Sequence, residues 1–262
     1  MRIILEALKI DKMPRAQRVH LWFSFLFAIS ASIYLTAPSG GQLDLFKTQL
    51  SAFLQRQAGL PFPPPVWFSV LFRQVGLVVL SMAFILIYAV HWLFASSEVT
   101  GQVTVSEDPL EIPSLPLSRG KSATGVAIRA FPSFLLLGIA MIIPYIISIP
   151  SLGIPFYVLA SMLSMTIFIL IFEEKKLAGA MEASYRMTRG MKFFIFVSFL
   201  FLGSITNMAA DLLRMVFRSS LWAASLVRAF FFALKTLAFG RLAAIFYRSL
   251  SAREAAAKNS PG

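Results

Sequence analysis

The chain has 262 residues, of which 58% are hydrophobic, and its mean hydropathy is +0.76. No segment between its apolar stretches exceeds about 35 residues, which is below the usual size of an independent soluble domain, so a single membrane domain accounts for residues 1–262. The chain has no cysteine, which excludes disulfides, thiolate metal sites and a cysteine nucleophile.

Six stretches are long and apolar enough to cross a bilayer. A hydrocarbon core of about 30 Å needs a helix of about 20 mainly apolar residues. Backbone polar groups in lipid must also be satisfied within their own segment, which favours helices. We therefore predict an all-α, polytopic membrane protein with six transmembrane helices, at residues 19–37, 74–95, 131–149, 152–172, 193–211 and 221–247. We expect the first to be an uncleaved anchor, because Pro38 follows Thr36-Ala37 and five spans follow.

The net charge of +12 is distributed unevenly about these spans. The side that carries both termini has sixteen Lys and Arg: Arg2, Lys9, Lys12, Arg15, Arg18, Arg119, Lys121, Arg129, Lys175, Lys176, Arg186, Arg189, Lys192, Arg248, Arg253 and Lys258. The opposite side has four: Lys47, Arg56, Arg214 and Arg218. Because cytoplasmic loops retain Lys and Arg, both termini are predicted in the cytoplasm. The expected partner of this charge is anionic lipid headgroups, and nucleic acid is not expected.

An amphipathic segment, residues 2–13, precedes the first span. One helical face of it carries four apolar residues: Ile3, Ile4, Ala7 and Leu8. Pro14 ends the segment. A basic helix of this kind lies in the membrane interface, with its apolar face toward the lipid.

The external loop at residues 38–65 follows the first span. An apolar stripe predicts a helix on the outer surface: Leu43, Phe46, Leu50, Phe53 and Leu54. Pro61 and the run Pro63–Pro65 then predict an extended return to the membrane.

The cytoplasmic loop at residues 96–120 is acidic and rich in proline. It carries Glu98, Glu107, Asp108 and Glu111 close to the basic side of the spans. Two interpretations stay open. It is a solvated loop that neutralises nearby charge, or it is a docking segment for a partner protein.

Two more amphipathic segments precede the third and fifth spans, at Ser118–Ala130 and Glu173–Arg189. In the latter, Glu182 and Arg186 are spaced for an i,i+4 ion pair. Together with residues 2–13, they suggest a three-fold repeat of an interfacial helix and a helical hairpin. The alternative is that basic amphipathic segments flank the spans of most membrane proteins. Pro144 predicts a kink inside the third span, and residues 150–153 a tight hairpin.

The third amphipathic segment carries a recognisable motif. Glu173-Glu174-Lys175-Lys176 leads to a run that includes Glu182, Ser184, Arg186, Arg189 and Gly190, and Phe193-Phe194 begins the next span. This pattern resembles a six-span bacterial membrane-protein superfamily of uncharacterised function, similar to the membrane domain of glycerophosphoryl diester phosphodiesterases. The resemblance implies a six-helix domain. It does not imply phosphodiesterase activity, which in that family belongs to a separate soluble barrel.

A rival family is the permease subunit of ATP-driven importers, whose cytoplasmic loop carries E-A-A-x3-G. Glu182-Ala183-Ser184 begins like that loop, but Thr188 stands at the glycine position. Exporter-type permeases with six spans lack so sharp a signature and stay open as an interpretation.

Residues suited to catalysis are scarce. The histidines are His20 and His91, each close to a tryptophan at a predicted interface, where such amphipathic side chains are common. Zinc normally needs three or four protein ligands, and no H-E-x-x-H spacing occurs. We therefore expect no catalytic residues, no metal site, no cofactor and no enzymatic activity.

Charge at membrane depth is the least usual chemistry of the chain. Arg228 and Lys235 are seven residues apart and share a face of the last span, while Arg241 lies on another face. A central Lys or Arg costs about 2.5–3.5 kcal/mol on insertion scales. Asp211, in the preceding span, is a candidate partner for Arg214 or Arg218, with Arg228 as a further alternative. The alternatives are structural pairing between the last two helices or a cationic cleft for an anionic headgroup or solute. The candidate residues of that cleft are Arg228, Lys235, Arg241, Asp211 and Arg214.

Small residues predict helix packing seams. One ridge consists of Ser24, Ala28 and Ser32, and a second of Gly240 and Ala244. Such residues allow close backbone approach in lipid. The seams are expected within the chain or between two copies in a homodimer.

The leading functional hypothesis is a non-enzymatic, multi-pass protein of the bacterial cytoplasmic (inner) membrane. It would bind or organise anionic lipid, or a membrane or cytoplasmic partner. The alternative is a transporter or permease component that moves an anionic or lipid-like solute through a cleft near Lys235. An intramembrane enzyme is the third hypothesis.

Overall fold

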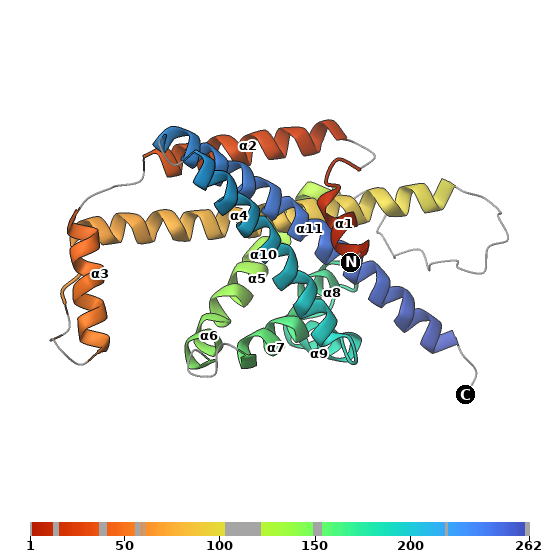
Figure 1. Ribbon diagram of the computed structural model, residues 1–262. Coiled ribbons are helices and arrows are strands. Elements are labelled where there is room, and N and C mark those ends of the chain that lie inside the picture. Colours follow the sequence, from red (N-terminus) through yellow and green to blue (C-terminus); the bar gives the residue numbers. More distant parts are fainter. Residues whose placement is uncertain are drawn as a thin grey trace.

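The structure is a computed structural model that describes residues 2–12, 16–36, 41–55, 59, 61–102, 122–148, 154–217 and 220–259. All the regular structure in these ranges is helical (Figure 1). The helices are α1 (Arg2–Leu8), α2 (Ala16–Leu35), α3 (Gly41–Leu54), α4 (Pro65–Gln102), α5 (Ala123–Ala140), α6 (Ile142–Ser148), α7 (Ile154–Leu163), α8 (Thr166–Phe172), α9 (Leu177–Met187), α10 (Lys192–Val216) and α11 (Leu221–Asn259).

Six segments in the described ranges are long and apolar enough to span a membrane: Gln17–Leu35, Pro65–Ser96, Ala123–Ser148, Pro155–Phe172, Lys192–Val216 and Leu221–Ala256. The predicted all-α, six-span membrane architecture is therefore confirmed. The second span begins at Pro65, nine residues before the predicted start at residue 74, because the charged residue Arg73 does not end the helix. The Arg73 guanidinium donates a hydrogen bond to the Thr36 carbonyl at the end of α2.

Two of the spans are interrupted. The third consists of α5 and α6, which separate at Met141, three residues before Pro144. Proline has no N–H to donate to the carbonyl four residues earlier, so this break fulfils the predicted kink. The fourth span consists of α7 and α8, which separate at Ser164 and Met165. Its interruption contains no proline and was not predicted.

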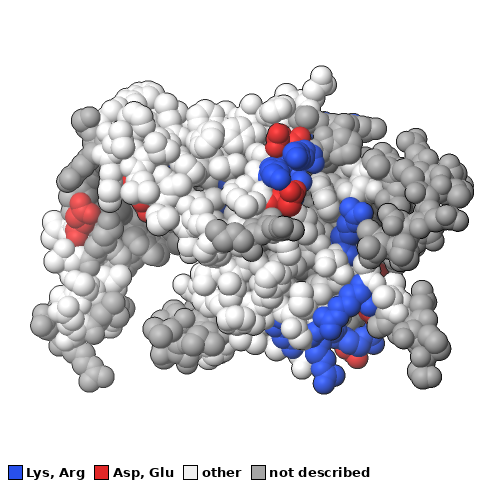
Figure 2. Space-filling model, turned by 45° about the vertical axis from the view of Figure 1, so that its right-hand side comes forward, with Lys and Arg blue, Asp and Glu red and all other residues white. Residues whose placement is uncertain are grey.

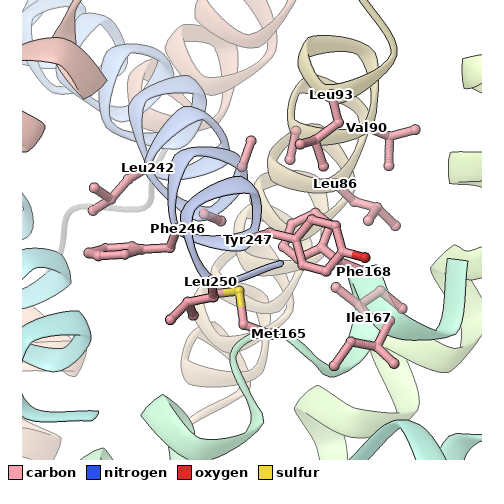
Figure 3. Packing of buried hydrophobic residues seen from close by; sticks show 14 of the residues in the cluster. Leu86, Val90, Leu93, Met165, Ile167, Phe168, Leu242, Phe246, Tyr247 and Leu250 are labelled. Carbon is pink, nitrogen blue, oxygen red and sulfur yellow. The ribbon is translucent and has the colours of Figure 1, made fainter. Parts of the chain in front are cut away.

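Helix α11 is the central element, packing against α1, α2, α4 and α10. Its C-terminal half forms a hydrophobic core with α4 and α8 (Figure 3). Tyr247 lies at the centre of this core, with its ring centroid 5.3 Å from that of Phe168 and 5.5 Å from that of Phe172. The core therefore ties the broken fourth span to the last helix.

Gly240 allows α4 and α11 to approach closely. A Cβ atom at this position would lie 2.8 Å from the Ile85 carbonyl oxygen. This seam therefore lies within the chain. The other small-residue ridge, Ser24, Ala28 and Ser32, is exposed on α2, and its use in a homodimer stays a prediction.

The surface helices agree with the predictions in part. Helix α3 lies across the end of α4 (Figure 1), as expected for the external loop. Helices α1 and α9 form, but the predicted lipid-facing side of α1 packs against the protein: Ala7 is buried in the hydrophobic core, and Ile3, Ile4 and Leu8 contact it. Residues 123–130 are the first turns of α5 and continuous with its span, so the second amphipathic segment is not a separate helix there. The three-fold repeat stays a prediction.

Two predicted connections fall mainly outside the described ranges. Helix α4 continues to Gln102, so the expected cytoplasmic acidic loop at 96–120 does not begin at residue 96. The rest of that loop, from residue 103, lies outside the described residues. The predicted hairpin at residues 150–153 also lies outside the described residues.

Candidate functional site

The five charged residues predicted for one cleft are distributed over separate places. Asp211 and Arg214 form an ion pair on α10, with 3.0 Å between Oδ1 and NH1. Arg228 is exposed on α11, close enough to Tyr34 of α2 for an electrostatic interaction. The predicted pairing of Asp211 with Arg214 is thus confirmed, but these residues do not line a cleft with Lys235.

Arg241 is buried, with 5% of its surface exposed, and contacts the segment that contains α1. Its guanidinium donates hydrogen bonds to the carbonyl oxygens of Lys9 and, at 3.3 Å, Lys12. It also lies 3.6 Å from the Glu6 carboxylate. A cation is favourable at the carbonyl end of a helix. Arg241 therefore holds the N-terminal segment against α11, which is a structural role.

Glu6 interacts with two cations, Lys9 of its own segment and Arg241 of α11. The hydrogen bond from Lys9, at 2.6 Å, is the main reason why the pKa of Glu6 lies below its ordinary value of 4.5. The positive charges of Lys9 and Arg241 lower this pKa in addition. The ionised form of Glu6 is therefore favoured chiefly by Lys9 in its own segment, with a smaller contribution from Arg241 of α11.

Lys235 lines a cleft of about 460 Å³ between α7, α10 and α11, which we name the intramembrane cleft. The Lys235 ammonium donates a hydrogen bond to Oδ1 of Asn207, at 3.1 Å. The other lining residues are mainly apolar or aromatic, with three serines: Tyr157, Ala160, Ser161, Ser164, Ile195, Phe196, Phe199, Leu200, Gly203, Ser204 and Phe239. Ligand pockets commonly have volumes of about 300–1,000 Å³ and this apolar character.

The sequence identified only part of this cleft. Gly203 and Asn207 of α10 are four residues apart, so their spacing alone places them on one face of that helix. Tyr157 and Ser161 belong to α7 and Ser164 follows its end, and no pattern in the chain connects these residues with Lys235. Only the packing of α7 against α10 brings the two groups together.

A second cationic cleft, of about 580 Å³, lies between the end of α9 and the last turns of α11. We name it the arginine cleft, since Arg186, Arg189 and Arg253 line it together with Glu254. Arg186 lies 3.3 Å from the Glu254 carboxylate, so the predicted pair with Glu182 is wrong. Gly190 turns the chain with φ of 82°, and the Arg253 guanidinium lies beside it.

The arginine cleft belongs to a basic face at the end of the spans where α1, α9 and the last turns of α11 lie. This basic face contains Lys9, Lys12, Lys175, Lys176, Arg186, Arg189, Lys192, Arg248 and Arg253. In Figure 2 the Lys and Arg side chains gather in one half of the view, whereas the other half is almost free of them. Two of the predicted motif residues, Arg186 and Arg189, therefore belong to a cationic surface.

Ser184, another motif residue, is buried in a contact between α9 and the broken fourth span. Its hydroxyl donates to the Met162 carbonyl at 2.7 Å and accepts from the Met165 N–H at 3.2 Å. A helix interrupted within a membrane needs such partners for its freed backbone groups. Ser184 is fully buried, so this side of the amphipathic helix α9 packs against the protein and not against lipid.

His91 connects α4 with α5. Its ring nitrogens lie 2.9 Å from the Ile87 carbonyl oxygen and 3.2 Å from the Thr124 hydroxyl. Trp22 packs edge-on against the ring, with 4.9 Å between centroids. Over the described ranges, no three His, Cys, Asp or Glu side chains are grouped to hold a metal ion.

Comparison of the chain with models of protein families, with curated proteins and with solved structures gave no match. The structure by itself shows six candidate membrane-spanning helices in the described ranges. The resemblance of residues 173–194 to the six-span bacterial superfamily stays a prediction.

Proposed function

We propose that the protein is a non-enzymatic component of a bacterial cytoplasmic membrane that binds anionic lipid at its basic face. The observation that supports the proposal most directly is the arginine cleft, where three arginines and one glutamate line a space of about 580 Å³. Arginine is suited to this task because its planar guanidinium binds phosphate oxygens in bidentate fashion.

The surroundings of the arginine cleft have the amphipathic character of a membrane interface. Lys192 stands at the start of α10 with its ammonium 3.8 Å from the centre of the Tyr185 ring. Phe193 follows it and is 76% exposed, which is expected of a side chain that faces acyl chains. A phosphate in the cleft would therefore lie at headgroup level, with its acyl chains next to α10.

The first test compares two variants of equal charge. The first replaces Arg186, Arg189 and Arg253 by Gln, and the control replaces Lys12, Lys176 and Lys192, which do not line the cleft. Non-specific attraction to anionic lipid is worth about 1 kcal/mol for each cation near the surface, so it weakens both variants equally. If the cleft binds a phosphate, the arginine variant loses about tenfold more affinity than the control.

The measurement is binding of short-chain phosphatidylglycerol to the purified protein, with the corresponding phosphatidylcholine for comparison. Equal losses in the two variants would remove the cleft from the proposal. Wild-type protein that does not prefer phosphatidylglycerol to phosphatidylcholine would contradict lipid recognition altogether.

A transporter or permease component for an anionic or lipid-like solute is the second candidate. It is favoured by the position of Lys235 in a cleft between spans. Binding at that cleft is the step that such a function needs first.

A further inference from the structure

The intramembrane cleft differs from the arginine cleft in depth. Lys235 follows Leu221 by 14 residues and precedes Arg248 by 13, which places it about 20 Å from each at 1.5 Å per residue. The hydrocarbon core of a bilayer is about 30 Å thick. Lys235 thus lies near the middle of the last span, far from the headgroups at either surface.

The opening of this cleft lies on the lipid-facing side of the helices. Leu200 is 47% exposed, and Ser204 and Asn207, on the same side of α10, are exposed as well. At this depth an exposed side chain meets acyl chains rather than water. A molecule that enters the cleft from this side must therefore carry an apolar part.

The charge of Lys235 is not matched by an acidic group in the described part of the chain. Its hydrogen-bond partner there is the neutral amide of Asn207, and no ion pair of Lys235 occurs there. Asn207 accepts through Oδ1, so its amide nitrogen is a second donor for the same ligand. The polar part of a ligand at this point is therefore expected to be an anion.

The walls of the cleft suit an acyl chain. Phe196 and Phe199 of α10 face it together with Phe239 of α11. Apolar and aromatic walls with a few polar groups are typical of sites that bind small molecules.

We propose that the intramembrane cleft binds a single-chain acidic amphipath from the bilayer, with its carboxylate or phosphate head on Lys235 and Asn207 and its chain against the phenylalanines. This site is separate from the arginine cleft, and its occupancy does not depend on headgroup binding at the basic face.

The test uses palmitic acid that carries a photoactivatable diazirine in its chain, with the protein in nanodiscs of phosphatidylcholine. After irradiation, mass spectrometry of peptides locates the label. We expect it on α7 and α10 beside the cleft. Unlabelled palmitate and lysophosphatidate, added separately as competitors, distinguish a carboxylate head from a phosphate head.

Three variants define the site. Lys235→Gln is expected to reduce labelling of α7 and α10 about tenfold, and Lys235→Arg to retain most of it. Arg228→Gln removes a cation from the same helix outside the cleft and is expected to leave labelling unchanged. Ser204→Phe keeps Lys235 but fills the cleft, so it is expected to abolish labelling even if Lys235→Gln does not fold.

Two outcomes would overturn the proposal. The first is labelling of folded Lys235→Gln or of Ser204→Phe at the wild-type level. The second is a label spread evenly over all lipid-facing helices of the wild-type protein. None of these results would bear on the arginine cleft, whose test uses headgroup binding and different variants.

Discussion

At the scale of single residues, Ser184 shows how a side chain on a surface helix stabilises a span. Its hydroxyl connects the carbonyl of Met162, in the last turn of α7, with the N–H of Met165, in the interruption between α7 and α8. Neither backbone group has its usual helical partner at such a break, and in lipid no water replaces it. A span can therefore break here without proline because the neighbouring helix α9 supplies the missing partners.

The variant Ser184→Ala tests this role. It leaves two buried backbone groups unsatisfied, which is expected to lower the free energy of unfolding by about 1–3 kcal/mol. The control is Ser32→Ala, because Ser32 is exposed and bonds only to the carbonyl of Ala28 within its own helix. Unfolding in mixed detergent micelles measures both. Equal stability of the two variants would mean that α9 does not support the break.

At the scale of the element, α1 is held against α11 by polar contacts around Arg241 and Glu6 and by apolar residues that pack against the hydrophobic core. The Tyr88 hydroxyl adds a hydrogen bond to the Ile10 carbonyl, at 2.9 Å, and Ala7 is fully buried. The pKa of Glu6 is lowered mainly by Lys9 of its own segment and in addition by Arg241 of α11, and only the part from Arg241 favours docking; that part is fully present above pH 4.5, the ordinary value. It is lost as the pH falls through the lowered pKa.

A spin label at Leu5→Cys, an exposed position of α1, detects this change. The chain has no other cysteine, so the label reports on α1 alone. Acidification below pH 4.5 is expected to increase the mobility of the label as docking weakens, and Glu6→Gln is expected to remove this pH dependence. Asp11→Asn is the control and should keep it. If the mobility of the label still changes with pH in Glu6→Gln, the pH response belongs to another titratable group.

At the scale of the whole molecule, the charge distribution relates the helices to the membrane. A chain that crosses the bilayer with all six candidate spans has α1 and the last turns of α11 on one side of the membrane and α3 on the other. The basic face lies on the side of α1 and α9, which predicts that this side is cytoplasmic.

Single cysteines in the cysteine-free chain test that orientation. Ser51→Cys, exposed on α3, is expected to react with a membrane-impermeant maleimide on intact cells. Ala256→Cys, exposed near the end of α11, is expected to react only after the membrane is permeabilised. The reverse pattern would invert the proposed orientation and move the arginine cleft to the outer surface.

The five charged residues predicted for a single cleft illustrate the limit of sequence reasoning. Asp211 and Arg214 are three residues apart on one helix, so their pairing followed from local spacing. Arg241 was grouped with Lys235 because both are cations in the same span, yet it contacts the N-terminal segment. That contact depends on the rotation of α11 and on where α1 docks, neither of which the local pattern contains.

The sequence by itself determined the six spans, the uneven positive charge and the position of Lys235 at membrane depth. These properties depend on length, hydropathy and residue order, and each can be judged within one segment. The tertiary structure alone decided which cations share a cleft. Arg253 joins Arg186, and Asn207 joins Lys235, only because helices far apart in the chain pack with particular rotations and crossing points.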